Sequence, residues 1–110
     1  MDQIFLNKKL SNGIKYLKSK NFKKAIKCFE YLLKDKKTET FGLLHIGITF
    51  IEQNQESLAL NYFNRILEKD TQNEAANINL GLIYFRQKNY EKSIIYFQKV
   101  LNKDSKHLIS

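Results

Sequence analysis

The sequence predicts an all-α fold made of stacked helix pairs, and three observations lead to this prediction. The 110-residue chain has no proline and only four glycines, which favours uninterrupted helices over turn-rich β structure. Apolar residues recur at helical spacing over residues 74–87 and 90–103. The same pattern returns every 34 residues, a period typical of helical repeat arrays.

The repeat consists of six columns of residues in register across three copies, 6–39, 40–73 and 74–107. The columns are Gly13, Gly47 and Gly81; Tyr16, Phe50 and Tyr84; Ala25, Ala59 and Ser93; Ile26, Leu60 and Ile94; Phe29, Phe63 and Phe97; and Leu33, Leu67 and Leu101. We therefore expect residues 1–110 to form a single domain of three antiparallel helix pairs, with six helices in all.

A short polar turn divides each copy into two helices. The turns are Lys20-Asn21, Asn54-Gln55 and Lys88-Asn89. Asparagine tolerates left-handed backbone and caps a following helix well. The glycine column falls inside the first helix of each pair, where glycine costs about 1 kcal/mol relative to alanine. We expect a close approach of two helix backbones to require it, with Ala25, Ala59 and Ser93 facing the glycines.

These columns resemble the tetratricopeptide repeat. The motif-bearing segments are Leu80-Gly81-x-x-Tyr84 with Ser93-x-x-x-Phe97, Ile46-Gly47-x-x-Phe50 with Ala59-x-x-x-Phe63, and Gly13-x-x-Tyr16 with Ala25-x-x-x-Phe29. The resemblance covers 102 of the 110 residues, although Lys9, Leu43 and Asn77 stand where the family usually has tryptophan. It implies a right-handed α-solenoid whose first helices line a concave groove that holds a peptide or a partner helix.

The resemblance also implies fifteen partner-binding positions on the first helices. They are Leu10, Ile14, Leu17, Lys18, Phe41, Leu44, His45, Ile48, Ile51, Glu52, Ile78, Asn79, Leu82, Phe85 and Arg86; the same face contains Asn7, Ser11 and Ala75. Ten of the fifteen are large apolar residues, which favours a partner helix or an extended apolar peptide. We expect the central contacts to be Phe41, Leu44, Ile48, Leu82 and Phe85, with Lys18, Glu52 and Arg86 setting orientation at the rim. The alternative is that superhelix curvature hides these side chains against neighbouring repeats.

One subgroup of the family clamps the C-terminal carboxylate of heat-shock chaperones with lysine, asparagine and arginine residues. At the positions that would carry this clamp the chain has Leu10, Ile14, His45, Ala75 and Asn79. The resemblance therefore does not imply a chaperone-tail receptor.

A self-assembling scaffold is a second functional hypothesis. Only Leu108, Ile109 and Ser110 follow the third repeat, so we expect the helix that carries Ile95, Phe97 and Val100 to have an uncovered flank. Either a second copy covers this flank or the chain is a piece of a longer protein.

A third and weaker hypothesis is nucleic-acid binding. The net charge of +8 is concentrated in residues 6–39, which carry eleven lysines and three acidic residues. Lysine lacks the planar fork of arginine, and the sequence shows no aromatic residues interleaved with the lysines as a base-stacking platform needs. These features favour a solvated surface, or as an intermediate hypothesis an acidic partner segment, over nucleic acid.

The sequence predicts no catalytic, cofactor or metal site. His45 and His107 are 62 residues apart, and we interpret His45 as a groove or packing residue. Cys28 is the single cysteine, which excludes an intrachain disulfide, and we expect a passive thiol there. No apolar run is long enough to span a bilayer, and the N-terminal residues lack the charge order of a secretion signal. We therefore expect a cytoplasmic, non-enzymatic protein that binds another protein or peptide.

Overall fold

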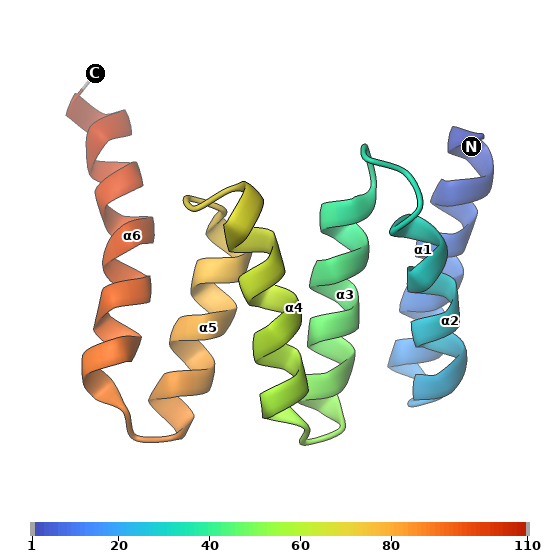
Figure 1. The fold of residues 1–110 in the computed structure, drawn as a ribbon, viewed down its shortest axis with the longest axis horizontal. Helices are drawn as coiled ribbons and strands as arrows, with labels where there is room; N and C mark the ends of the chain where they lie inside the picture. Colours follow the sequence, from blue (N-terminus) through green and yellow to red (C-terminus); the bar gives the residue numbers. More distant parts are fainter. Residues whose placement is uncertain (1, 110) are drawn as a thin grey trace. The chain divides into compact units, whose positions relative to one another are not determined.

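The computed structural model describes the backbone of residues 2–109 and the side chains of residues 2–102. Within residues 2–109 it contains six helices and no strand, which confirms the all-α prediction (Figure 1). The helices are α1 (Gln3–Lys18), α2 (Phe22–Leu32), α3 (Glu39–Glu52), α4 (Glu56–Lys69), α5 (Glu74–Arg86) and α6 (Tyr90–Ile109). The last helix continues beyond the predicted end at residue 103.

The chain divides into two compact units, residues 1–62 and 63–110. The division lies inside α4. The first unit contains α1, α2, α3 and the beginning of α4, and the second contains the rest of α4, α5 and α6. That residues 1–110 form a single domain stays a prediction.

Three turns with the same backbone conformation join the helices of each pair. Lys20, Asn54 and Lys88 have φ values of 63°, 61° and 63°, in the left-handed region. After the first, Asn21 donates its backbone N–H to the Tyr16 carbonyl at 2.8 Å, and the other two turns have equivalent bonds of 2.8 and 2.9 Å. This is the Schellman arrangement, which satisfies carbonyl groups left open at a helix end.

The left-handed residue is therefore the first of each turn, and in two turns it is a lysine rather than an asparagine. The asparagines act one position later, as predicted for caps: the Asn21 and Asn89 side chains accept from the backbone N–H groups of Lys24 and Lys92, each at 3.4 Å. The hydrogen-bond pattern dictates the left-handed position, even though an L side chain there costs about 1–2 kcal/mol.

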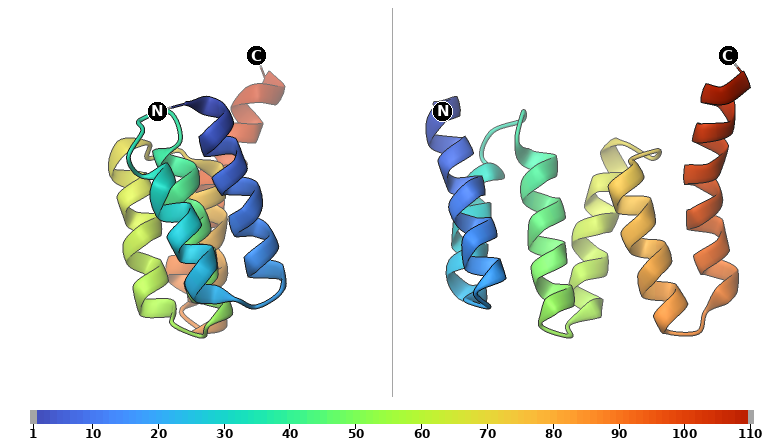
Figure 2. Two further views of the ribbon diagram at one scale, coloured as in Figure 1. Left: turned by 90° about the vertical axis from the view of Figure 1, so that its right-hand side faces the viewer. Right: turned by 180° about the vertical axis from the view of Figure 1, so that it is seen from behind.

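The core of the first unit lies where α2 packs against both α1 and α3 (Figure 2). Its buried residues are Leu6, Ala25, Phe29, Leu32 and Ile46. Phe29 is fully buried, and its ring stacks on the imidazole of His45 with centroids 5.1 Å apart. A single phenylalanine of α2 thus contacts α3 as well as α1.

The glycine column does mark close approaches, but the partner is a phenyl ring rather than a helix backbone. A Cβ atom added at Gly13 would lie 2.8 Å from Cδ1 of Phe29, and one added at Gly81 would lie 2.8 Å from Cδ1 of Phe97. In the third repeat the small residue faces the glycine as predicted, since the Ser93 hydroxyl donates to the Gly81 carbonyl at 2.9 Å. The prediction of backbone-to-backbone contact at Gly13 and Gly81 was wrong because the phenylalanine column takes that space.

In the second unit α5 and α6 pack against each other, and the buried apolar residues are Phe63, Ile66, Ala76, Leu80 and Ile83. Of the three residues predicted to lie on an uncovered flank of α6, only one is exposed. Ile95 is 53% exposed as predicted, whereas Phe97 and Val100 are half-buried. Phe97 is withdrawn from the flank because its ring packs on Gly81.

Replacing the two glycines by alanine should have unequal effects, although helix propensity alone favours alanine by about 1 kcal/mol at both sites. The Phe29 ring at Gly13 is fully buried and has no room to shift, whereas the Phe97 ring at Gly81 is partly exposed. We expect Gly13→Ala to lower the free energy of unfolding by about 1–3 kcal/mol, as overpacking usually does, and Gly81→Ala to lower it less. Urea unfolding followed by circular dichroism measures both. Equal effects, or a more stable Gly13→Ala variant, would contradict the ring-on-glycine account.

Candidate functional site

The side of α1 that carries the predicted partner-binding residues lines a recess in the first unit. The cavity has a volume of about 370 Å³ and is lined by Asn7, Leu10, Ser11, Ile14, Lys15 and Lys18. All but Lys15 stand at positions that the resemblance assigned to the partner-binding face. Leu10, Ile14 and Leu17 pack against the core with one side and remain partly exposed on the other. In Figure 2, right, α1 lies in front of α2, so this helix is not covered by its pair-mate from that side.

The corresponding face of α3 is more apolar. Phe41 is 52% exposed, Leu44, Ile48 and Ile51 are half-buried, and Glu52 is exposed. His45 is the inner residue of this set, because its ring stacks on Phe29 at an interplanar angle of 23°. It therefore acts as a packing histidine as well as a residue of the α3 face.

On α5, in the second unit, the predicted side chains are the most exposed. Leu82 is 46% and Phe85 is 55% exposed, Arg86 is exposed, and Ile78 is half-buried. The side-chain amide of Asn79 donates to the Ala75 carbonyl at 2.8 Å, so its donor is directed to its own helix.

Sequence reasoning missed one neighbour of this face. Tyr90, at the start of α6, is 52% exposed and meets the Phe85 ring edge-on at 5.5 Å between centroids. Tyr90 directly follows the turn between α5 and α6. This place in the sequence could have indicated that its ring lies beside Phe85 at the end of α5.

None of the fifteen predicted residues is buried. The α1 and α3 positions lie in the first unit and the α5 positions in the second. The alternative that packing hides these side chains does not hold for Phe41, Leu82 and Phe85, each of which exposes about half of its surface. The half-buried residues, such as Leu44 and Ile48, combine core packing with a partly open face.

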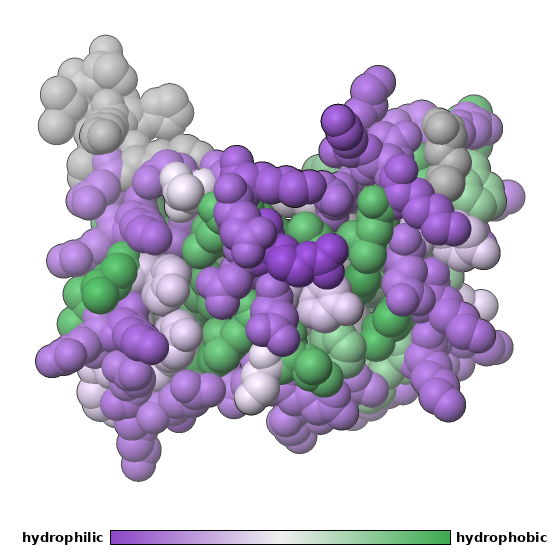
Figure 3. Space-filling view, in the orientation of Figure 1, coloured by the Kyte–Doolittle hydropathy of each residue, from purple (hydrophilic) through white to green (hydrophobic). Residues whose placement is uncertain are grey.

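The basic first repeat contains contacts between lysines and aromatic rings. The Lys9 ammonium lies 4.4 Å from the centroid of Tyr31 and 5.3 Å from that of Phe5, and Lys24 lies 5.6 Å from that of Tyr16. The Lys9–Tyr31 and Lys24–Tyr16 contacts join different helices, so the order of residues along the sequence does not reveal them. On the face shown in Figure 3, hydrophilic side chains project along the edge where α1 and α2 lie.

The groups with potential chemistry are few. Within the described residues there is no cluster of three or more histidine, cysteine or acidic residues that could hold a metal ion. Over the residues that the structure describes, no helix is both long and apolar enough to cross a bilayer. Cys28 is a buried free thiol, and the side chain of His107 lies outside the described residues.

Stacked helices joined by repeated turns, with one face of each first helix left open, define a helical repeat protein. The tetratricopeptide repeat family matches the chain twice, over residues 42–72 and over residues 74–107. The chain belongs to the tetratricopeptide repeat family. Repeats of this family are generally protein–protein interaction modules. No curated protein matches the chain.

Protonation of His45 should destabilise the fold. Burial lowers the pKa of His45 from its ordinary value of 6.5, so the unfolded chain binds this proton more readily than the folded chain does. The His45 contribution to stability is complete above pH 6.5 and is lost as the pH falls below that value. We expect the urea midpoint of the wild type to fall more between pH 7.5 and 5.5 than that of His45→Phe, which keeps an aromatic ring on Phe29.

All other titratable groups are shared by the two proteins, so the difference between their profiles isolates His45. Identical pH profiles would show that the imidazole is not desolvated by its contact with Phe29.

Proposed function

We propose that this chain is a non-catalytic protein-interaction module whose first-helix faces bind an apolar segment of a partner protein, either an amphipathic helix or an extended peptide. The supporting observation is the exposure of large apolar side chains at positions predicted for binding, above all Phe41, Leu82 and Phe85. Exposed aromatic and aliphatic side chains at fixed helical spacing match the anchor pattern of helix-in-groove recognition.

Burial of these side chains against a partner would contribute favourably to the free energy of binding. Full burial of one large apolar side chain contributes roughly 1.5–3 kcal/mol relative to exposure. Phe41, Leu82 and Phe85 each retain about half of their surface for a partner. The recess on α1 adds a concave site for a partner side chain, with Asn7 and Ser11 offering polar atoms at its wall. Lys18 and Glu52 in the first unit, and Arg86 in the second, would each fix the orientation of a segment bound at the face on which it stands.

The cytoplasm is the compartment we propose. The single cysteine cannot form an intrachain disulfide, so the fold gains nothing from an oxidising compartment. Binding through apolar faces requires no cofactor.

Two leucines of similar exposure provide a matched test. Leu82 on the α5 face is 46% exposed, and Leu58 on α4, outside the predicted face, is 43% exposed. Binders are first selected from a displayed library of random 16-residue peptides, and their affinities for variants are then measured by fluorescence anisotropy. We expect Leu82→Ala and Phe85→Ala to weaken the selected peptides at least fivefold, a cost of about 1 kcal/mol or more, because hot-spot anchors lose that much on truncation.

Leu58→Ala should leave the affinity within twofold of the wild type. Equal losses at Leu82 and Leu58, in folded variants, would reject the assignment of the α5 face.

The second candidate is a self-assembling scaffold, favoured by one face of α6. Tyr90, Ile94 and Leu101 follow one another at i, i+4 and i+11, which places them on one side of the helix. Their exposures are 52%, 53% and 61%. A second copy that placed the same stripe against this one would bury six large side chains in a two-fold interface.

Light scattering after size-exclusion chromatography, at low and high salt, tests this candidate. If α6 mediates self-association, the wild type should be dimeric at both salt concentrations, because apolar burial is little screened by ions, and Ile94→Glu should be monomeric. A wild-type monomer at high micromolar concentration would reject the scaffold and leave the first-helix faces as the functional surface.

A further inference from the structure

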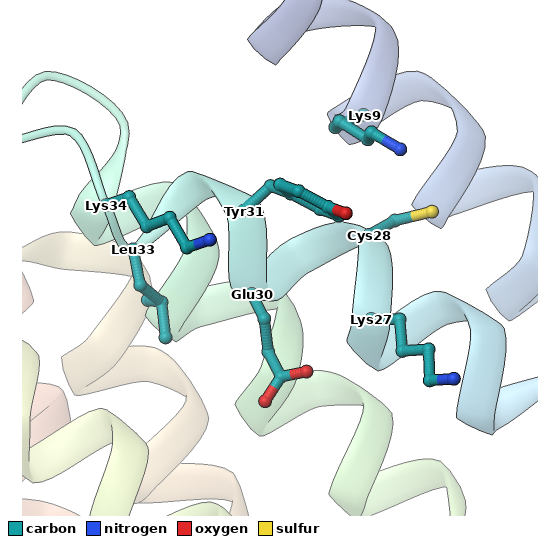
Figure 4. Close-up of a pocket in the computed structure, with 7 residues that line it drawn as sticks. All are labelled: Lys9, Lys27, Cys28, Glu30, Tyr31, Leu33 and Lys34. Atoms are coloured by element: carbon teal, nitrogen blue, oxygen red, sulfur yellow. The ribbon is translucent and has the colours of Figure 1, made fainter. Parts of the chain in front are cut away.

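A second cavity in the first unit lies away from the proposed partner-binding face. It has a volume of about 800 Å³ and is lined by Lys9, Lys27, Cys28, Glu30, Tyr31, Leu33 and Lys34. Lys9 belongs to α1, and the other six come from α2 and the two residues after it (Figure 4). At about 100° per residue, Lys9 stands on the side of α1 opposite to Ile14 and Lys18, which line the first recess.

The cavity is strongly basic. Its lining contains three lysines and one carboxylate, that of Glu30. The Glu30 side chain points away from Lys9 and Tyr31 (Figure 4). The surrounding repeat adds to the field, because residues 6–39 carry eleven lysines and three acidic residues. An anionic group entering the cavity would therefore meet a net positive field.

Aromatic contacts order two of these lysines. The Lys9 and Lys34 ammonium groups lie 4.4 and 5.1 Å from the centroid of the Tyr31 ring, and Tyr31 lies between the two in Figure 4. The Phe5 ring meets Tyr31 edge-on at 5.7 Å and also lies below Lys9. A lysine that is free on a surface loses rotamer freedom on binding, and these contacts reduce that entropic cost.

The composition of the lining indicates the ligand class. Leu33, Tyr31 and the nearby Phe5 offer apolar contact beside the charges, and Phe5 and Tyr31 are 38% and 36% exposed. A segment that combines carboxylates with apolar side chains matches both properties. Nucleic acid matches less well, because base stacking needs a free ring face and Tyr31 is already contacted by two lysines and by Phe5.

We propose that the cavity of Lys9, Lys27, Lys34 and Tyr31 is a docking site for an acidic, partly apolar segment of a protein partner. It is separate from the first-helix faces and uses none of the fifteen predicted partner-binding residues. A chain with both surfaces would hold two segments, one through apolar burial and the other through charge on an ordered aromatic platform.

The test uses the whole chain and a fluorescein-labelled 12-residue peptide made of four Asp-Glu-Leu repeats, titrated by anisotropy at 50 mM salt. We expect the peptide to bind the wild type, and the triple variant Lys9→Gln, Lys27→Gln, Lys34→Gln to bind at least tenfold more weakly. The matched control is Lys8→Gln, Lys20→Gln, Lys23→Gln, which removes the same charge from exposed positions of the same repeat outside the cavity. It should lose less than threefold.

Three results would overturn the proposal. If the peptide does not bind the wild type, or if the two triple variants lose equal affinity, the cavity has no special role. If an oligothymidylate of twelve nucleotides binds more tightly than the peptide and loses affinity with the cavity variant, the occupant is nucleic acid.

The role of the aromatic ring is tested separately with Tyr31→Leu. This variant should bind the peptide about threefold more weakly while circular dichroism shows an intact fold. An unchanged affinity would remove the role assigned to the ring.

Discussion

The contact between a phenylalanine ring of the second helix and a glycine of the first is the interaction on which the described helix pairs depend. In the first unit the Phe29 ring fills the space left by the missing side chain of Gly13 and also stacks on His45. One residue therefore joins α1, α2 and α3. The Gly81–Phe97 contact repeats the first half of this arrangement in the second unit, and the Ser93 hydroxyl adds a hydrogen bond to the Gly81 carbonyl. In these two pairs the ring occupies the space between the helices, and apolar residues on another face of the first helix remain partly exposed.

This arrangement gives α1 two faces with different chemistry. The side that carries Leu10 and Ile14 is apolar and forms a recess, whereas the side that carries Lys9 joins α2 to form a basic cavity with Tyr31 at its centre. The buried Phe29–Gly13 contact lies between helices and contributes to neither surface. Phe29 is assigned to stability alone, whereas His45, Leu10 and Ile14 both pack on the core and belong to the proposed binding faces.

Much of this could be predicted from the sequence because a repeat displays each structural requirement three times. The 34-residue columns located the helix pairs, the turns and the asparagine caps, and the family resemblance pointed to first-helix positions that the structure leaves exposed or half-buried. The columns could not show what stands opposite a glycine, so the phenyl ring was missed. They also could not assign the left-handed conformation to Lys20 and Lys88, since the hydrogen bonds of the turn decide it rather than residue preference. The repeat pattern also could not predict contacts between residues far apart in the sequence, such as that of Lys9 with Tyr31.

The central claim is that partner segments bind the predicted faces of α1, α3 and α5. Chemical-shift mapping of the 13.0 kDa chain by NMR, with a peptide selected for binding, tests this claim most directly. We predict that the largest shifts occur at first-helix residues such as Ile48, Leu82 and Phe85, with small changes along the exposed side of α4. Shifts concentrated on α4 or α6, with the first-helix faces unchanged, would contradict it.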